Sequence, residues 1–312
     1  MKLSDGPLQR LLWYGVRGVG QLLGPRTGRV LAAALLRLSS RSERGWLRGL
    51  YRAARYTSSS GPSLIKLPER WSADAPLVQV SRLGLDLHLD LRDNLQRTLF
   101  YTGTYEPGLL RFLHRELRCG DVAVDVGAHI GVHALMMARR LDQLGGGRVL
   151  AFEPAQDSAA KLRAAAIRNR LAVTVIELAL GRGPATVELF ADPRYDLADA
   201  GVRSQYGTGR PIQPVEVTSF DAWAHEARLG RLDVVKLDVE GAEPLVIEGM
   251  RASLKRLQPR ALVVEVKDRV LERSGVDEAE LRELLALCGY RSTGQVFHSN
   301  EVFRPASEPR HR

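Results

Sequence analysis

The sequence predicts a doubly wound α/β domain, in which helices cover both faces of a mostly parallel sheet. Three observations predict this fold. Short apolar runs have the character of buried strands, helical stretches separate most of them, and a glycine-rich turn follows the first run. Strands joined by crossover helices form parallel sheets, and ligands bind at the carboxyl ends of such strands. The predicted strands cover residues 122–126, 149–152, 173–177, 232–237 and 261–266.

Length, charge and cysteine content limit the possible classes of protein. The 312 residues are 45% hydrophobic, which suits one large catalytic domain with an appendage. Residues 1–60 hold one lysine and ten arginines against one aspartate and one glutamate, a net charge of +9 that equals the charge of the whole chain. The basic character therefore belongs to this segment. Cys119 and Cys288 form no CxxC pair, which favours a reducing compartment and excludes a thiolate metal site.

Residues 1–60 are predicted to form a basic helical extension. Within residues 41–56, five arginines recur every three or four residues and share one stripe of a helix, with Trp46 on the other side. This helix suits peripheral contact with an anionic membrane, or plain packing against the catalytic domain; no nucleic acid is expected as a partner. Arginines interrupt the apolar runs, so neither a secretory signal nor a spanning helix is predicted. We expect a cytoplasmic protein, at most peripheral at the inner membrane surface.

Residues 61–100 are predicted to be a linker and a β-hairpin that leads into the core. Leucines alternate with other residues from Leu83 to Leu91, which is the period of a half-buried strand. The catalytic domain is predicted over residues 101–312. It begins with a helix that has Pro107 in its first turn.

The remaining elements follow in order. Helices are predicted around residues 134–141, 162–166, 247–257 and 281–288, the third closed by Pro259 and the last capped by Gly289, with further strands within 290–303. Residues 191–214 are rich in glycine and polar residues, which suits a mobile lid over the acceptor, although an ordinary loop fits equally well. Five side chains there are candidates for acceptor contact: Tyr195, Arg203, Ser204, Gln205 and Tyr206.

A nucleotide cofactor is predicted at the ends of the first two strands of the domain. Gly127 and Gly131 stand four residues apart at the turn from strand to helix, and Glu153 ends the next strand, where it can accept hydrogen bonds from ribose hydroxyls. A dinucleotide fold typically has G-x-G-x-x-G, whereas this turn has G-x-x-x-G with His129 inside it. The spacing favours S-adenosylmethionine over a nicotinamide dinucleotide.

Seven motifs then occur in a distinctive order. They are Tyr105-Glu-Pro107, Asp125-Val-Gly-Ala-His-Ile-Gly131, Ala151-Phe-Glu-Pro154, Asn169, Ala179-Leu180, Val235-Lys-Leu-Asp-Val-Glu-Gly-Ala-Glu243 and Glu265. Together they resemble the FkbM family of methyltransferases over roughly residues 100–266. The resemblance implies the class I methyltransferase fold, with seven strands of which the last is antiparallel, and O-methylation. His129 stands where family members often have asparagine.

The residues at the later strand ends are candidates for chemistry. Asp238, Glu240 and Glu265 are predicted to take the proton of an acceptor hydroxyl or to bind the acceptor. An alternative is that Glu240 and Glu243 cap the helix that begins at Pro244. Two carboxylates two residues apart also leave a divalent cation open, but no metal site is predicted.

The remaining cofactor residues complete the predicted site. Asp125 is expected to bind the methionine amino group or to orient the turn, and Ala179 and Leu180 to border the adenine. Lys236 is expected to stabilise the acidic cluster. The predicted function is an S-adenosylmethionine-dependent O-methyltransferase acting on a sugar, glycolipid or polyketide-type hydroxyl. The alternatives are a nicotinamide-dependent oxidoreductase and a non-catalytic membrane-surface module.

Overall fold

The computed structural model describes residues 77–90, 93–191, 203–204, 211–267, 271 and 274–306. The predicted basic extension over residues 1–60, with its arginine stripe, lies outside the described residues. Among the described helices, none has the length and apolar character that crossing a membrane requires.

The chain divides into two units, which comprise residues 1–78 with 89–104, and 79–88 with 105–312. In the first unit, α3 (Asn94–Thr102) forms where the sequence predicted no helix. Its start is capped by Asp93, whose side chain accepts a hydrogen bond from the backbone N–H of Gln96, and Gly103 ends it in the left-handed conformation.

The predicted hairpin is present as β1 (Leu77–Arg82) and β2 (Leu85–Asp90). Leu83 and Gly84 form the turn between them, and both have positive φ, which is the conformation of tight hairpin turns. The leucines of β2 are buried while Asp86 and His88 between them are exposed. The alternation therefore holds in β2 but begins two residues later than predicted.

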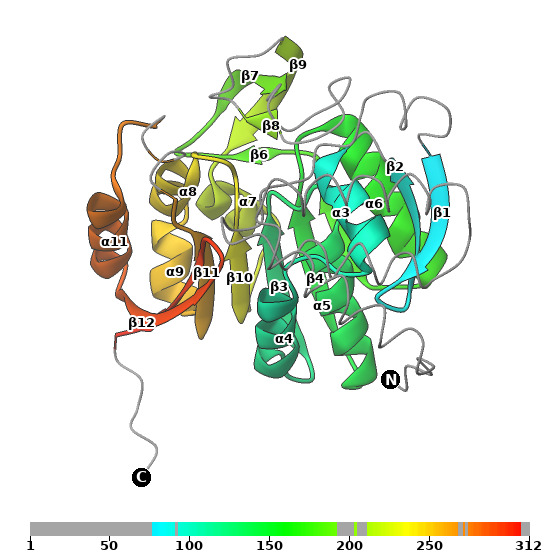
Figure 1. Ribbon diagram of the computed structural model, residues 1–312. Helices are drawn as coiled ribbons and strands as arrows, with labels where there is room; N and C mark the ends of the chain where they lie inside the picture. The colour runs from blue at the N-terminus through cyan, green and yellow to red at the C-terminus, as the bar shows by residue number, and fades with distance from the viewer. Residues whose placement is uncertain are drawn as a thin grey trace, which may run out of the picture. The chain divides into compact units, whose positions relative to one another are not determined.

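The second unit contains a seven-stranded sheet with the order β12-β13-β11-β10-β3-β4-β5 (Figure 1). The bounds are β3 (Asp121–Val126), β4 (Gly147–Phe152), β5 (Val173–Ile176), β10 (Val234–Leu237), β11 (Ala261–Glu265), β12 (Tyr290–Phe297) and β13 (Asn300–Pro305). Within this sheet β13 runs antiparallel to both of its neighbours, and the other described pairs are parallel. The prediction of a doubly wound, class I methyltransferase-like sheet with its last strand antiparallel is confirmed.

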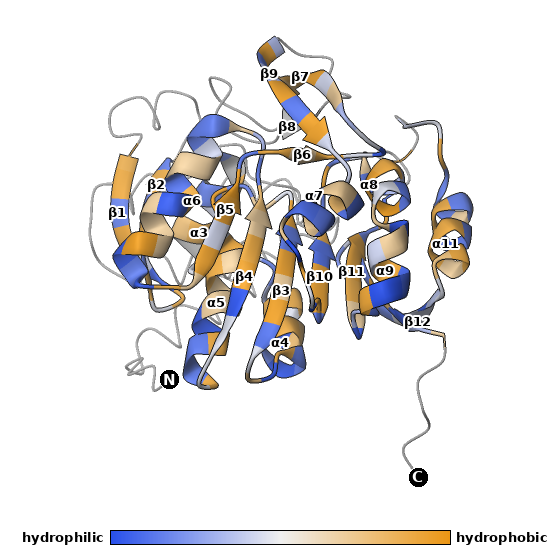
Figure 2. Ribbon diagram, turned by 180° about the vertical axis from the view of Figure 1, so that it is seen from behind, coloured by the Kyte–Doolittle hydropathy of each residue, from blue (hydrophilic) through white to orange (hydrophobic). Residues whose placement is uncertain are grey.

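Helices cover both faces of this sheet. One hydrophobic core joins alternate residues of β3, β4, β10 and β11 to α7 (Phe220–Glu226), α8 (Glu243–Gly249), α9 (Arg251–Leu257) and α11 (Glu278–Leu287). On the opposite face lie α4 (Pro107–Glu116) and α5 (Val132–Gln143), as Figures 1 and 2 together show; α6 (Gln156–Asn169) follows β4. The central strands are largely apolar along their length (Figure 2). Burial on both faces explains their continuous apolar runs.

The single helix predicted over residues 247–257 is wrong in one respect, because it is two helices. α8 ends at Gly249 and α9 begins at Arg251, with Met250 as the cap residue between them. A Cβ at Gly249 would lie 1.9 Å from the backbone oxygen of Gly181, so another segment of the chain presses against the end of α8. This tertiary contact has no signal in the local helical pattern.

A second sheet, with the order β6-β9-β7-β8, lies beyond the carboxyl ends of β3 and β4 (Figure 2). Its strands are β6 (Ala179–Leu180), β7 (Ala185–Ala191), β8 (Arg203–Ser204) and β9 (Pro211–Thr218). The predicted lid over residues 191–214 is therefore wrong at its ends, where β7 and β9 pair with each other. Its central part, with Tyr195, Gln205 and Tyr206, lies outside the described residues.

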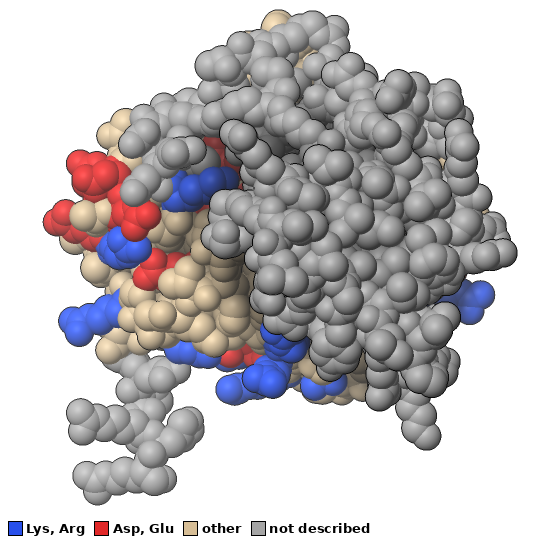
Figure 3. Space-filling view, in the orientation of Figure 1, with Lys and Arg blue, Asp and Glu red and all other residues tan. Residues whose placement is uncertain are grey.

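The described surface carries mixed charge around α11. Figure 3 shows acidic and basic side chains side by side there, and Arg282 contacts both Glu278 and Glu301 at 2.9 Å. Pairs of this kind on a surface contribute little stability individually. The mixture agrees with the balanced charge of residues 61–312 in the sequence.

Candidate active site

The register of the sheet brings polar residues from four strands onto one face at its carboxyl end. Asp125 of β3 pairs with Lys236 of β10, and Lys236 pairs with Val263 of β11. Two residues after Val263, Glu265 pairs with Asn300 of β13. Because register partners project from the same face and side chains alternate along a strand, all four polar residues share one face. This is the face that α4 and α5 cover (Figure 1).

Lys236 lies between two carboxylates in the interior of the protein. Its ammonium is 3.3 Å from Oδ1 of Asp125 and 3.4 Å from Oδ2 of Asp238, while Lys236 is only 2% exposed. Burial by itself lowers the pKa of Lys236, but attraction to Asp125 and Asp238 outweighs it and raises the pKa above its ordinary value. The predicted role of Lys236 in stabilising the acidic cluster agrees with this geometry.

Asp238 is held in its ionised form. Burial raises its pKa, whereas Lys236 and His133 lower it, and the net direction is downward. A quarter of its side chain remains exposed, 24% by area. Asp238 is thus an ionised carboxylate that a ligand can still reach.

The two glycines of the turn after β3 are required by the packing of the protein itself. Gly127 and Gly131 both have φ in the left-handed region. A Cβ at Gly127 would lie 1.9 Å from the backbone oxygen of Asp238, and one at Gly131 would lie 2.0 Å from Cδ1 of Leu162. Gly127 therefore brings the predicted cofactor turn against the acidic segment that follows β10.

His129, inside this turn, also has positive φ, and it precedes α5, whereas His133 lies in the first turn of that helix. The two histidines, although four positions apart, therefore do not share a helix face. The backbone N–H of His129 donates a hydrogen bond to Oε2 of Glu153 at 2.7 Å. The turn is thus anchored to the end of β4.

Glu153 follows β4 and is buried. Besides the N–H of His129, its carboxylate accepts a hydrogen bond from the backbone N–H of Ala155 at 2.9 Å. Each carboxylate oxygen can accept a second hydrogen bond, so ribose hydroxyls remain possible donors. The structural role of Glu153 in fixing the turn had no sequence signal, and its cofactor role stays a prediction.

Ala179 and Leu180 form β6, which pairs with β9. The Leu180 side chain belongs to the main hydrophobic core, and Ala179 packs against the small cluster of Ala155, Leu189 and Val215. Packing thus accounts for both side chains, and their contact with adenine stays a prediction.

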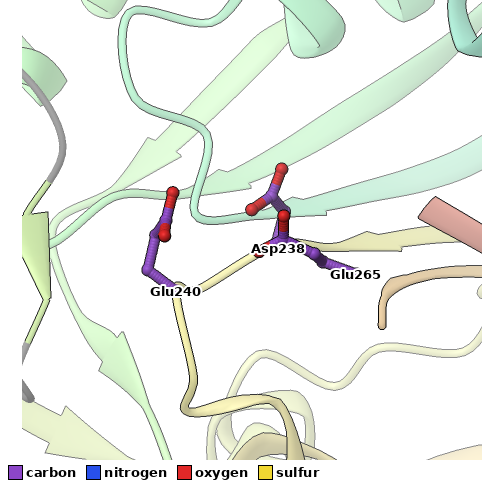
Figure 4. Close-up of side chains that lie close together, drawn as sticks. All are labelled: Asp238, Glu240 and Glu265. Carbon is purple, nitrogen blue, oxygen red and sulfur yellow. The ribbon is translucent and has the colours of Figure 1, made fainter. Parts of the chain in front are cut away.

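The three predicted catalytic carboxylates come together. Asp238 and Glu240 follow β10, Glu265 ends β11, and one ligand oxygen from each lies within 4.8 Å of the others (Figure 4). Glu240 has a φ of +56°, an unusual conformation for a glutamate. The tertiary structure thus joins Glu265 to two carboxylates that stand 25 and 27 positions before it in the chain.

Glu243 holds the loop that carries this cluster. It is fully buried, and it accepts hydrogen bonds from the backbone N–H groups of Val239 at 2.8 Å and Gly241 at 2.9 Å. Burial raises its pKa to about 8, although the backbone N–H groups of Val239 and of Glu243 itself favour the ionised form. The predicted capping of this helix is wrong, because α8 has no side-chain cap hydrogen bond and the Glu243 carboxylate instead holds the loop before it.

Glu265 is held mainly in its protonated form in the absence of a cationic ligand. Burial raises its pKa to about 9, and the neighbouring charges of Asp238 and Glu240 act in the same direction. The hydroxyl of Ser299 donates a hydrogen bond to Oε1 of Glu265 at 2.8 Å.

This shift makes the stability of the protein depend on pH. Folded Glu265 keeps its proton up to a pKa of about 9, whereas the unfolded chain releases it near 4.5. Between these values the unfolded state binds fewer protons, so stability falls as the pH rises. We expect Glu265→Gln to unfold at a higher temperature than wild type at pH 9 and at a similar temperature at pH 5. Each kcal/mol gained in the free energy of unfolding raises the unfolding temperature by roughly 2–4 °C.

The measurement is thermal unfolding in buffer with EDTA at both pH values. Glu226→Gln, at an exposed position of α7, is the matched control and should follow wild type. If the unfolding temperatures of wild type and Glu265→Gln differ by the same amount at pH 5 and at pH 9, Glu265 does not carry a proton in the folded protein between these pH values.

Several polar residues of the site were not predicted. Glu106 has a φ of +41° before α4; its Oε2 lies 3.1 Å from Nε2 of His133, and its Oε1 accepts a hydrogen bond from Nδ2 of Asn300 at 3.4 Å. The Tyr105 ring meets the His133 ring edge to face, with centroids 6.0 Å apart. The position of Glu106 before Pro107 was visible as a helix start. No local pattern marks Asn300 or His133.

Comparisons of the sequence with known proteins relate this chain to methyltransferases. Residues 125–292 match the methyltransferase FkbM domain. The chain is 28% identical over 181 residues to the hexuronic acid methyltransferase AglP of Haloferax volcanii, covering 58% of this chain and 68% of the relative. It is 31% identical over 182 residues to the 31-O-demethyl-FK506 methyltransferase FkbM of Streptomyces tacrolimicus. This match covers 49% of this chain and 68% of the relative.

Solved structures with partial similarity include two proteins in complex with AdoMet. The 16S rRNA N2 G1207 methyltransferase of T. Thermophilus, in complex with AdoMet and guanosine, has 15% identity and a TM-score of 0.39, covering 73% of this chain and 49% of its own. TYW2 of M. jannaschii, in complex with AdoMet, has 12% identity and a TM-score of 0.39. This match covers 74% of this chain and 87% of the TYW2 chain.

Proposed function

Because the chain belongs to the methyltransferase FkbM domain family, we propose that it transfers a methyl group from S-adenosylmethionine to a hydroxyl of a sugar, glycolipid or polyketide-type metabolite. The observation that carries the proposal is the contact between Gly127 and Asp238, which brings the predicted cofactor turn against the carboxylate cluster. The two relatives, named for a hexuronic acid and for 31-O-demethyl-FK506, support a hydroxylated acceptor.

The residues at the end of β3 and β4 fit the cofactor. Oδ2 of Asp125 is buried and has no hydrogen-bond partner among the described residues, which suits the ammonium group of the methionine moiety. Glu153 follows β4, where a carboxylate can accept hydrogen bonds from ribose hydroxyls. When bound, S-adenosylmethionine supplies a methyl group that its positive sulfur has already activated.

The chain then has to hold and deprotonate the acceptor. Asp238 is ionised and partly exposed, so it can accept the proton of a hydroxyl that gains the methyl group on its oxygen. Lys236 keeps Asp238 charged from the buried side. Glu240 and Glu265 lie within reach of the same acceptor and can orient its other hydroxyls.

The first test is binding of the cofactor itself. Calorimetry on the full chain should show binding of S-adenosylmethionine and S-adenosylhomocysteine and none of NAD. Binding of NAD alone by folded protein would contradict the proposal and favour the oxidoreductase. The acceptor is tested by formation of S-adenosylhomocysteine with a panel of uronic acids, neutral glycosides and hydroxylated macrolides.

The ribose assignment predicts a selective loss of affinity. We expect Glu153→Ala to bind S-adenosylmethionine about 10–100-fold more weakly, because it loses two hydrogen bonds to a charged acceptor. Because Glu153 also holds the N–H groups of His129 and Ala155, far-UV circular dichroism must show that the variant is folded. Calorimetry measures the affinity, and Glu226→Ala at an exposed position is the control. Equal affinities for Glu153→Ala and wild type would refute the assignment.

A further inference from the structure

We propose that Asp238, Glu240 and Glu265 bind one divalent cation of the kind that prefers oxygen ligands, such as Mg²⁺ or Mn²⁺. The site would lie at the carboxyl ends of β10 and β11, with Glu240 and Asp238 from the loop after β10 and Glu265 from the last residue of β11 (Figure 4).

The spacing of the oxygens suits a single ion. One oxygen from each carboxylate lies within 4.8 Å of the other two. Two oxygens bound to one ion are separated by at most twice the ion–oxygen distance, which is roughly 4 Å for Mg²⁺ and about 5 Å for Ca²⁺. The three oxygens are therefore close enough for one divalent ion to bridge them once the carboxylates close on it.

Unpartnered acceptors beside the cluster also point to a cation. Oε2 of Glu265 is buried without a hydrogen-bond partner among the described residues, although Glu265 is only 6% exposed. Asn300 is 1% exposed and stands opposite Glu265 in the sheet, so both side chains leave the same face. Nδ2 of Asn300 donates a hydrogen bond to Glu106, while Oδ1 of Asn300 has no hydrogen-bond partner among the described residues.

The amide orientation of Asn300 is consistent with this role. A carboxylate accepts hydrogen bonds only, so the group facing Glu106 must be the NH₂ of Asn300, and the carbonyl oxygen is turned elsewhere. Buried acceptors without donors are unfavourable unless a cation or a donor meets them. Oδ1 of Asn300, on the residue opposite Glu265, is thus a candidate for a further oxygen ligand, either directly or through water.

The nearby lysines do not replace such an ion. Lys236 is shared between Asp125 and Asp238, and Lys267 lies 3.7 Å from Oε1 of Glu265 with 41% of its side chain exposed. A ligand set of carboxylates and an amide oxygen, without thiolate or imidazole, selects hard cations over zinc or copper.

The role of the ion rests on the proposed function, whereas its binding does not. An ion held here would bind one or two oxygens of a polyhydroxylated acceptor and lower the pKa of the hydroxyl that is methylated. Less basicity would then be required of Asp238. The ion would thus favour acceptors with adjacent oxygens, such as sugars.

The test uses the full chain, stripped with EDTA and titrated with Mn²⁺ while electron paramagnetic resonance reports the free ion. We expect one Mn²⁺ per wild-type chain, displaced by excess Mg²⁺. Glu265→Gln and Glu240→Gln should each weaken binding at least about tenfold, since the loss of an outer-shell partner alone costs 10–100-fold. The control Glu226→Gln should bind as wild type does.

Two results would overturn the site: wild type that binds no Mn²⁺, or folded Glu265→Gln and Glu240→Gln that both bind it as wild type does. Two substitutions guard against failure of either one to fold. Calorimetry with S-adenosylmethionine on the same samples separates the two proposals. Cofactor binding without Mn²⁺ binding refutes the metal site alone, whereas Mn²⁺ binding without cofactor binding refutes the proposed function alone.

Discussion

Replacing Asp238 with asparagine is expected to lower kcat by about 10²–10⁴-fold, the usual contribution of a positioned general base, while the affinity for S-adenosylmethionine stays largely unchanged. Asparagine keeps the shape of the side chain and an oxygen for Lys236, which lies 3.4 Å from Asp238. It removes the negative charge that accepts a proton. The backbone oxygen of Asp238, which meets the turn at Gly127, is untouched.

The measurement pairs turnover with binding. Formation of S-adenosylhomocysteine with the best acceptor of the panel gives kcat, and calorimetry gives cofactor affinity for the same sample. Asp142→Asn, at an exposed position of α5, is the matched control and should leave both values unchanged. An unchanged kcat for Asp238→Asn excludes Asp238 as the base, and a parallel loss of cofactor affinity would assign it to binding instead.

Replacing Arg260 with methionine is expected to lower the free energy of unfolding by about 3 kcal/mol, near the lower end for breaking a buried ion pair. Arg260 stands before β11, at the amino ends of the strands, and contacts Asp121, Glu116 and Asp233. Asp121 is fully buried, so loss of this guanidinium leaves its charge poorly compensated. Methionine keeps the packing of the aliphatic stem.

The chain offers a matched control for this substitution. Arg231 contacts two of the same carboxylates, Asp121 at 3.1 Å and Asp233 at 2.7 Å, but its side chain is 54% exposed. Arg231→Met should therefore cost less than about 1 kcal/mol. Urea denaturation at neutral pH measures both values. If Arg260→Met and Arg231→Met lower the free energy of unfolding equally, burial does not govern the strength of these contacts.

Cofactor binding should survive in both arginine variants at temperatures where they are folded. The network around Arg260 lies at the amino ends of β3, β10 and β11, whereas Gly127 and Asp238 follow the carboxyl ends of β3 and β10. Selective loss of cofactor affinity in Arg260→Met would contradict this separation of stability from function.

Features that depend on residues close together in the chain could be predicted from the sequence. The apolar strands were predictable because both of their faces are buried. The turn was predictable from Gly127 and Gly131, two residues with positive φ at which a Cβ would clash. Asp238, Glu240 and Glu265 were predictable as strand-end residues, since parallel strands present their carboxyl ends at one edge. Helix α3 and the small sheet of β6 to β9 were missed. In β9 only Val215 is buried, so this strand lacks the apolar run that marks a core strand.

The tertiary structure alone decided how these parts meet. Asn300 and Glu106 contact each other across 194 positions of the chain, and no local pattern encodes such a pairing. The register between β11 and β13 places Asn300 beside Glu265, and the close approach of Gly127 joins the turn to Asp238. Local sequence thus determined which residue types stand at the strand ends. Strand order and register, which arise from packing of the whole sheet, determined which of them share a site.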